Sequence, residues 1–168
     1  MKTLIVVRHA KSSWDIIGQK DFDRTLNERG KRDAPEMAKR LKEKGLKIDL
    51  FVSSPAKRAK KTAKHFAAAF NTDKDDIVLI DKLYEAPMET FYEVVQGLNN
   101  KWDSVVLFAH NPGITAFVNT LTDVHTDNMP TCGLFAVQAD TNDWNAFRES
   151  NRQFLFFDYP KNPLGHLD

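Results

Sequence analysis

Short apolar runs alternate with amphipathic stretches along this chain. The runs are four or five residues long and occupy 3–7, 50–54, 77–80, 105–109, 134–137 and 154–157. Such runs are typical of strands that are buried on both faces of a parallel sheet. Between them, apolar residues recur at every third or fourth position and predict helices over about 27–44, 55–70, 87–98 and 113–121. Strands that alternate with helices predict an α/β domain with a mostly parallel sheet.

The ends of the predicted helices carry recognisable signals. Asn27 precedes the first helix as a suitable N-cap, and Gly45 follows its last apolar position. Pro55 is expected at the first position of the second helix, where its missing N–H is not needed. Pro35 falls inside the first helix, and we expect it to kink that helix or to move its start.

Composition narrows the class of protein. A chain of 168 residues, 42% hydrophobic and 28% charged, fits one globular domain over residues 1–168. A single cysteine, Cys132, excludes a disulfide scaffold and a metal site built from cysteines. A net charge of +1 predicts no general attraction to nucleic acid or membrane. No apolar run approaches the length of a membrane span, and the N-terminus lacks a signal-peptide layout, so we expect a cytoplasmic protein.

Candidate chemistry gathers where the predicted strands end. Arg8 and His9 follow the first strand, Arg58 lies one helical turn after the second, and His110 follows the fourth. Ligands of open α/β sheets bind beyond the carboxyl ends of the strands. Each residue alone also fits an ordinary surface position, but two histidines and two arginines on one edge suit a phosphate, because the guanidinium fork matches its oxygens.

Helical geometry separates Arg58 from the lysines around it. The lysines of this helix fall opposite its apolar stripe, which is the solvated face. Arg58 lies about 80° to 100° from the stripe. It is also in the first turn, where helix amides and the macrodipole favour an anion. We therefore expect Arg58, and not the lysines, to reach inward.

These residues belong to blocks that resemble a known family. The blocks are Arg8-His9-Ala10-Lys11-Ser12-Ser13-Trp14-Asp15, Leu26-Asn27-Glu28-Arg29-Gly30, Ser53-Ser54-Pro55-Ala56-Lys57-Arg58-Ala59, Leu83-Tyr84-Glu85-Ala86 and Ala109-His110-Asn111-Pro112-Gly113. In order and spacing they resemble the histidine phosphatase superfamily, with Ala10 in the place of a glycine. The first block, the segment 30–35 and the closing Asp158-Tyr159-Pro160-Lys161 look like its SixA-type branch. The resemblance implies a phosphoglycerate-mutase-like fold, a three-layer α/β/α sandwich.

The resemblance also implies a two-step phosphoryl transfer that needs no metal and no cofactor. His9 would attack phosphorus and form a phosphohistidine intermediate that water hydrolyses. Its other ring nitrogen should donate to a backbone carbonyl and so fix the tautomer. Arg8, Arg58 and His110 would hold the phosphoryl oxygens.

Two further roles follow from the same resemblance. Glu85 matches the place of a carboxylic acid that protonates the leaving oxygen, although a loop glutamate remains an alternative. Ser13 matches a hydroxyl that contacts phosphate, with a simple loop hydroxyl as the alternative. We interpret His65, His125 and His166 as structural or surface residues and Cys132 as a small buried or half-buried residue.

The short chain bears on the substrate. Its longest loops, 10–26 and 122–132, could rim a phosphate site but hardly enclose a small molecule. This favours phosphohistidine on a protein as the substrate of a monomeric phosphatase. The alternatives are a phosphomonoesterase for a small metabolite or nucleotide and a non-catalytic phosphate-binding module. A mutase is disfavoured because it must hold two phosphate positions inside a closed site.

Overall fold

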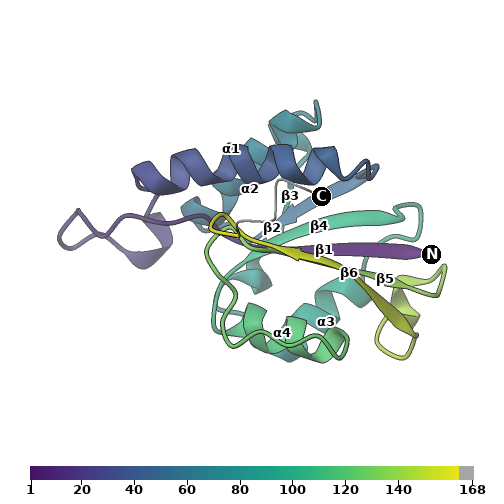
Figure 1. The fold of residues 1–168 in the computed structure, drawn as a ribbon. Coiled ribbons are helices and arrows are strands. Elements are labelled where there is room, and N and C mark those ends of the chain that lie inside the picture. Colours follow the sequence, from purple (N-terminus) through teal and green to yellow (C-terminus); the bar gives the residue numbers. More distant parts are fainter. Residues whose placement is uncertain (163–168) are drawn as a thin grey trace.

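One six-stranded sheet forms the centre of the molecule (Figure 1). The computed structural model describes residues 1–162, and its strands lie in the order β3-β2-β4-β1-β5-β6. Their bounds are β1 Lys2–Arg8, β2 Leu50–Ser53, β3 Val78–Leu79, β4 Ser104–Ala109, β5 Leu134–Ala139 and β6 Arg152–Asp158. The pairs β1–β4, β2–β4 and β2–β3 are parallel, whereas β5 runs antiparallel to both neighbours. The expected mostly parallel sheet is confirmed.

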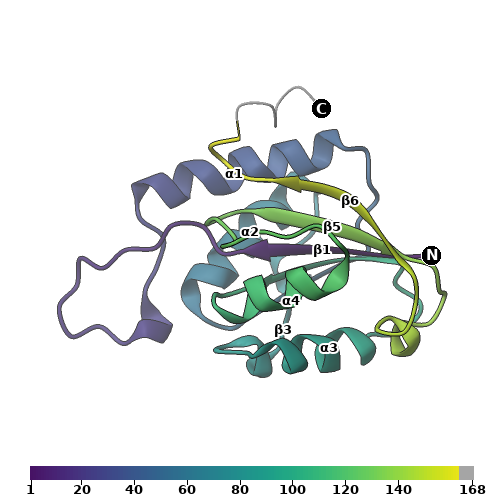
Figure 2. The ribbon, with the colours of Figure 1, turned by 60° about the horizontal axis from the view of Figure 1, so that its bottom comes forward.

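Two pairs of helices cover the sheet. The helices are α1 Glu28–Glu43, α2 Lys57–Ala69, α3 Met88–Gln96 and α4 Gly113–Leu121. Figures 1 and 2 show α1 and α2 on one face and α3 and α4 on the other, which confirms three layers. Four short 3₁₀ helices lie in the connections: η1 Asp21–Asp23, η2 Lys74–Asp76, η3 Asp81–Leu83 and η4 Trp144–Ala146.

A hydrophobic core lies on each face of the sheet, and strand β1 contributes side chains to both. Successive side chains of a strand point to opposite faces. Leu4 and Val6 belong to the core beneath α3 and α4, whereas Ile5 and Val7 pack with α1 and α2. All four side chains are fully buried. Because both faces of β1 are buried, apolar residues occupy successive positions of this strand and do not alternate with polar ones.

The ends of the helices follow the sequence signals with two exceptions. The side chain of Asn27 caps α1 by accepting from Gly30 N, and Gly45 takes a φ of +77° just beyond its end. Pro35 does not move the start of α1, and the helix continues through it. Its ring lies on the exposed face of the helix, outside the packing against the sheet. Pro55 precedes α2 instead of opening it, because Ala56 is the N-cap.

Strand β3 is shorter than the apolar run at 77–80. Only Val78 and Leu79 pair with β2, and both are exposed. An edge strand has a neighbour on one side only, so fewer of its residues can join the ladder. No helix in the described part of the chain is long and apolar enough to cross a membrane.

Parallel pairing brings three strand ends to one edge of the sheet. Arg8 lies opposite Ala109, and His9 N donates to Ala109 O at 3.1 Å. On the other side of β4, Ser54 N donates to Phe108 O at 3.0 Å. The residues that follow β1, β2 and β4 therefore meet at this edge, as expected for parallel strands.

Candidate active site

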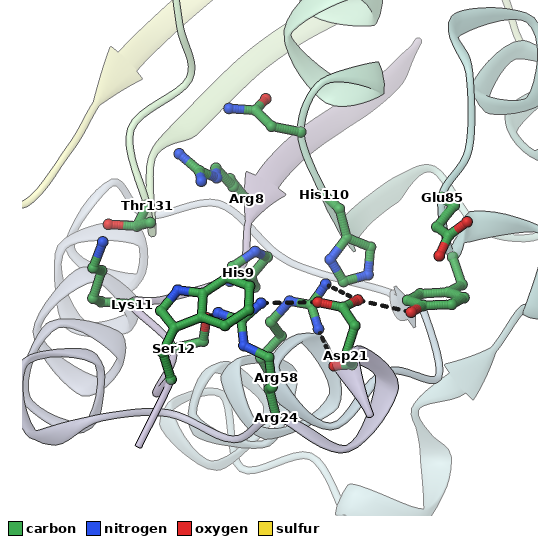
Figure 3. A pocket seen from close by; sticks show the side chains of 13 residues that line it. Arg8, His9, Lys11, Ser12, Asp21, Arg24, Arg58, Glu85, His110 and Thr131 are labelled. Carbon is green, nitrogen blue, oxygen red and sulfur yellow. Dashed lines mark hydrogen bonds and ion pairs between the residues drawn. The ribbon is translucent and has the colours of Figure 1, made fainter. Parts of the chain in front are cut away.

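A cavity of about 340 Å³ opens at the carboxyl edge of the sheet. Figure 3 shows its side chains converging from several elements. The cavity is lined by Arg8, His9, Lys11, Ser12, Trp14, Asp21, Arg24, Arg58, Tyr84, Glu85, His110, Asn111 and Thr131. All five residues expected to be catalytic are among them. The structure thus brings together the side chains that the strand ends and the family blocks indicated.

His9 is held with one ring nitrogen free. Its Nδ1 lies 2.7 Å from Ala10 O, and because a carbonyl can only accept, Nδ1 carries the proton. Burial lowers the pKa of His9 well below 6.5. The hydrogen bond to Ala10 O acts in the opposite direction and raises the pKa, whereas the charges of His110 and of both arginines lower it further. A neutral imidazole protonated on Nδ1 has its lone pair on Nε2. This is the state in which a histidine can act as a nucleophile.

The two arginines are fixed by different parts of the chain. Arg8 Nη1 donates to Met129 O at 2.8 Å. Arg58, at the start of α2, donates from Nη1 to Asp21 O at 2.8 Å and from Nη2 to Asp21 Oδ2 at 3.0 Å. Burial, followed by repulsion from Arg58, lowers the pKa of Arg8. Two like charges are therefore held around one cavity, an arrangement that an anion would stabilise.

His110 faces His9 across the cavity. Their ring centroids are 5.2 Å apart, and His110 Nε2 lies 2.7 Å from Ser54 Oγ. Burial lowers the pKa of His110 to about 3, with Arg58 and Arg8 adding to the effect and Asp21 opposing it. His110 is therefore neutral at neutral pH while the cavity holds no anion. A bound phosphate would raise its pKa and favour a protonated, oxygen-binding imidazole.

Three buried polar atoms of this site have no hydrogen-bond partner in the described structure. They are Arg8 Nε, Arg58 Nε and His110 Nδ1. Unpaired buried polar atoms are rare in native proteins, and they cost free energy. Three of them around one cavity fit a site built for a polar, negatively charged ligand.

Asp21 is a part of the site that sequence reasoning missed. Its carboxylate accepts from Tyr84 Oη at 2.7 Å, from Arg24 Nη1 at 2.8 Å and from Arg58. Burial alone raises the pKa of Asp21, but these hydrogen bonds outweigh burial and lower it to about 2. Asp21 is thus ionised and orients Arg58. The sequence of residues 10–26 indicates only a polar loop. The contact between η1 and α2, which brings Asp21 to Arg58, arises only in the folded chain.

Ser13 is not where the resemblance placed it. Ser12 lines the cavity, and its Oγ accepts from Arg24 Nη2, whereas Ser13 lies outside and its Oγ accepts from Asp15 N at 3.1 Å. The chain is extended here, with Ser12 bridged to Leu26. Neighbouring side chains of an extended segment point to opposite sides, so only one of the two serines can face the cavity.

Glu85 lines the cavity in an unusual backbone conformation. Its φ is 56°, a region that non-glycine residues seldom adopt and that costs free energy. The side chain is exposed at the rim, beside the Tyr84 hydroxyl. Strain retained at a cavity rim is consistent with a functional position for this carboxylate.

The remaining histidines and Cys132 lie outside the cavity where the structure describes them. His65 is half-buried on α2, and burial lowers its pKa. His125 is exposed, with Nδ1 3.9 Å from Asp127 Oδ1. Cys132 is fully buried, as expected, and His166 falls outside the described residues. In residues 1–162, no group of three or more His, Cys, Asp or Glu side chains is arranged to hold a metal ion.

The neutral buried imidazoles predict that acid destabilises the fold. An unfolded His110 binds a proton below its ordinary pKa of 6.5, whereas the folded residue stays neutral down to about 3. Lowering the pH therefore favours the unfolded state, by about 2 kcal/mol between pH 7.5 and pH 5.0 from His110 alone. Urea unfolding of the wild type and of His110→Asn at both pH values measures this. Equal losses of stability in the two proteins would contradict the buried neutral state.

Comparison with known proteins agrees with this geometry. The model of the histidine phosphatase superfamily (branch 1) matches residues 4–95, more than half of the chain. The crystal structure of the putative phosphohistidine phosphatase SixA from Agrobacterium tumefaciens is 29% identical, with a TM-score of 0.79 over 95% of this chain and 98% of that one. A SixA protein histidine phosphatase complexed with tungstate, 23% identical, has the same fold, with a TM-score of 0.79 over 95% of this chain and 98% of that one.

A metabolic enzyme is also similar to this chain. The 2,3-bisphosphoglycerate-dependent phosphoglycerate mutase of Bartonella bacilliformis is 38% identical over 102 residues. The match covers 58% of this chain and 47% of the mutase, so it spans about half of the mutase's length.

Proposed function

Because this chain belongs to the histidine phosphatase superfamily and is SixA-like, we propose that it is a metal-independent phosphatase with His9 as its nucleophile. Its proposed substrate is phosphohistidine carried on a protein. The observation that carries the proposal is the state of His9: Nδ1 is held by Ala10 O, which leaves the Nε2 lone pair for attack inside a cavity rich in arginine.

The proposed reaction has two transfers. In the first, His9 Nε2 forms a bond to phosphorus while the bond from phosphorus to the leaving group breaks. In the second, water attacks the phosphohistidine, and His9 leaves with its lone pair restored while phosphate is released. Arg8, Arg58 and His110 bind the phosphoryl oxygens, whose charge must be stabilised as the axial bonds change.

The form of the cavity supports a protein substrate. The side chains of His9, Arg58 and His110 are buried, whereas the rim residue Trp14 is 73% exposed. A phosphate carried on the surface of a protein could therefore enter the cavity beside Trp14. The similarity to a putative phosphohistidine phosphatase supports the same substrate class.

Rates on two substrate classes test this proposal. We expect a larger kcat/KM for a histidine-phosphorylated phosphotransfer protein than for sugar phosphates, nucleotides or phosphoserine. Much faster turnover of a small ester would instead assign the chain to the phosphomonoesterases. Binding of phosphate without turnover of any substrate would make it a phosphate-binding module, although the complete set of Arg8, His9, Arg58 and His110 argues against that.

Glu85 distinguishes the protein phosphatase from the phosphomonoesterase. An alkoxide leaving group needs a proton from the enzyme, whereas the protonated P–N bond of phosphohistidine brings its own. We expect Glu85→Gln to lower kcat on an alkyl phosphate about 10²-fold or more and to leave turnover of a phosphohistidine protein within a few-fold of wild type. Steady-state kinetics on both substrates measure the difference. Equal losses on both would show that Glu85 has another role, such as positioning Tyr84.

A further inference from the structure

Exposed large apolar side chains are concentrated in one loop beside the cavity. Among the described residues, seven such side chains are exposed, and four of them lie between residues 14 and 22. These are Trp14, Ile16, Ile17 and Phe22, with exposed fractions of 73%, 62%, 100% and 37%. Single exposed apolar residues are ordinary, but a cluster of them marks an interaction site.

The base of this loop is fixed to the catalytic cavity. Arg24 Nε donates to Ser13 O at 3.0 Å, and its guanidinium carbon lies 3.1 Å from the centroid of the Trp14 ring. The same arginine is paired with Asp21, which in turn binds Arg58. The base of the loop is therefore held in place by the residues that orient the phosphate site.

The tip of the loop projects away from the body of the protein. Figures 1 and 2 both show the segment between β1 and α1 extending beyond the sheet and the helices. A turn forms the tip, with Gln19 N donating to Ile16 O at 3.3 Å and Gly18 at a φ of +79°. This turn presents Ile16 and Ile17, which do not line the catalytic cavity. A small molecule bound at His9 could not contact them.

We infer that residues 14–22, the docking loop, bind the protein that carries the phosphorylated residue, through an apolar patch beside that residue. The inference rests on the proposed function. Trp14 connects the cavity with the apolar patch, since it lines the cavity and also belongs to the exposed apolar cluster. A ligand that places its phosphate at His9 and also covers these side chains must extend from the cavity past Trp14 to the tip, and a folded protein domain has that extent.

The test removes the apolar tip and leaves the cavity intact. The variant Ile16→Thr with Ile17→Thr keeps β-branched side chains but loses much of the apolar surface. Val78→Thr with Leu79→Thr is the matched control, because these two neighbouring side chains are also exposed but lie on β3, outside the cavity. Each protein is assayed on a histidine-phosphorylated phosphotransfer domain and on p-nitrophenyl phosphate.

We expect the tip variant to lose about 10-fold to 100-fold in kcat/KM on the phosphorylated domain, mainly through a higher KM. Its turnover of p-nitrophenyl phosphate should stay within two-fold of wild type, and the control should match wild type on both substrates. An unchanged KM for the phosphorylated domain would overturn the docking loop, as would an equal loss on both substrates.

Two other outcomes separate the possible failures. Wild type that turns over p-nitrophenyl phosphate but not the phosphorylated domain would refute the proposed substrate, and the docking loop with it. Wild type that is active on both substrates beside a tip variant of equal activity would refute the docking loop alone. Sedimentation shows whether the tip instead joins two copies of this chain. If wild type and the Val78/Leu79 control are dimers and the tip variant is a monomer, the inference is overturned.

Discussion

His9→Ala is expected to lower kcat/KM on any phosphorylated substrate by about 10⁴-fold or more, because it removes the imidazole that we propose as the nucleophile. Arg8, Arg58 and His110 would still bind phosphate, so the variant should retain affinity for inorganic phosphate while losing turnover. The change removes a buried imidazole that makes one backbone hydrogen bond, and the fold should survive it. Steady-state assays with p-nitrophenyl phosphate and a phosphohistidine protein measure the loss.

A matched control and a trapping experiment complete this prediction. His65→Ala removes a half-buried histidine from α2 outside the cavity and should leave kcat/KM near that of wild type. Brief exposure of wild type to a labelled phosphodonor should place an acid-labile, base-stable label on His9. Equal turnover by wild type and His9→Ala would refute the nucleophile, as would a label found on another residue.

Gly113→Ala is expected to lower the free energy of unfolding by about 3 kcal/mol or more. A Cβ at this position would lie 1.8 Å from Ala86 O and 3.1 Å from Phe91 Cε2. The first contact is with backbone, which cannot rotate away as the end of a side chain can. The first turn of α4 would have to separate from the loop that carries Glu85, so activity should fall along with stability. Urea unfolding measures the change in free energy.

Gly97 provides the matched control for this substitution. It follows α3 with a φ of −88°, and a Cβ there would come no closer than 3.4 Å to another residue, Glu93 O. Gly97→Ala should therefore change the free energy of unfolding by less than about 1 kcal/mol. If Gly113→Ala unfolded at the same urea concentration as wild type, the close packing of α4 against the Glu85 loop would be refuted.

The main elements of the site could be predicted because they depend on local rules. An apolar run ends close to where its strand ends, so the residues after β1, β2 and β4 could be identified from the sequence, and parallel pairing places them at one edge. Arg58 could be assigned because helical periodicity separates it from the solvated lysines. The bond from His9 to a backbone carbonyl followed from the family resemblance, and the structure places Ala10 O at that position.

The details that could not be predicted depend on contacts between distant segments. Ser12 and Ser13 are chemically identical, and the bridge between Ser12 and Leu26 decides which of them faces the cavity. Asp21 has no periodic or motif signal, and its role arises only because η1 packs against α2. The length of β3 likewise depended on its place at the edge of the sheet, which its apolar run does not encode.

The sequence by itself thus determined the order of strands and helices, the clustering of Arg8, His9, Arg58 and His110, and the family. The hydrophobic pattern, the helical period and the ends of apolar runs are local properties of a chain, and its residues encode them directly. The tertiary structure alone decided the environment of those residues: the neutral state of His9 and His110, the carboxylate of Asp21 on Arg58 and the projecting apolar loop. These depend on desolvation and on charges within a few ångströms, which exist only once segments far apart in sequence have packed together.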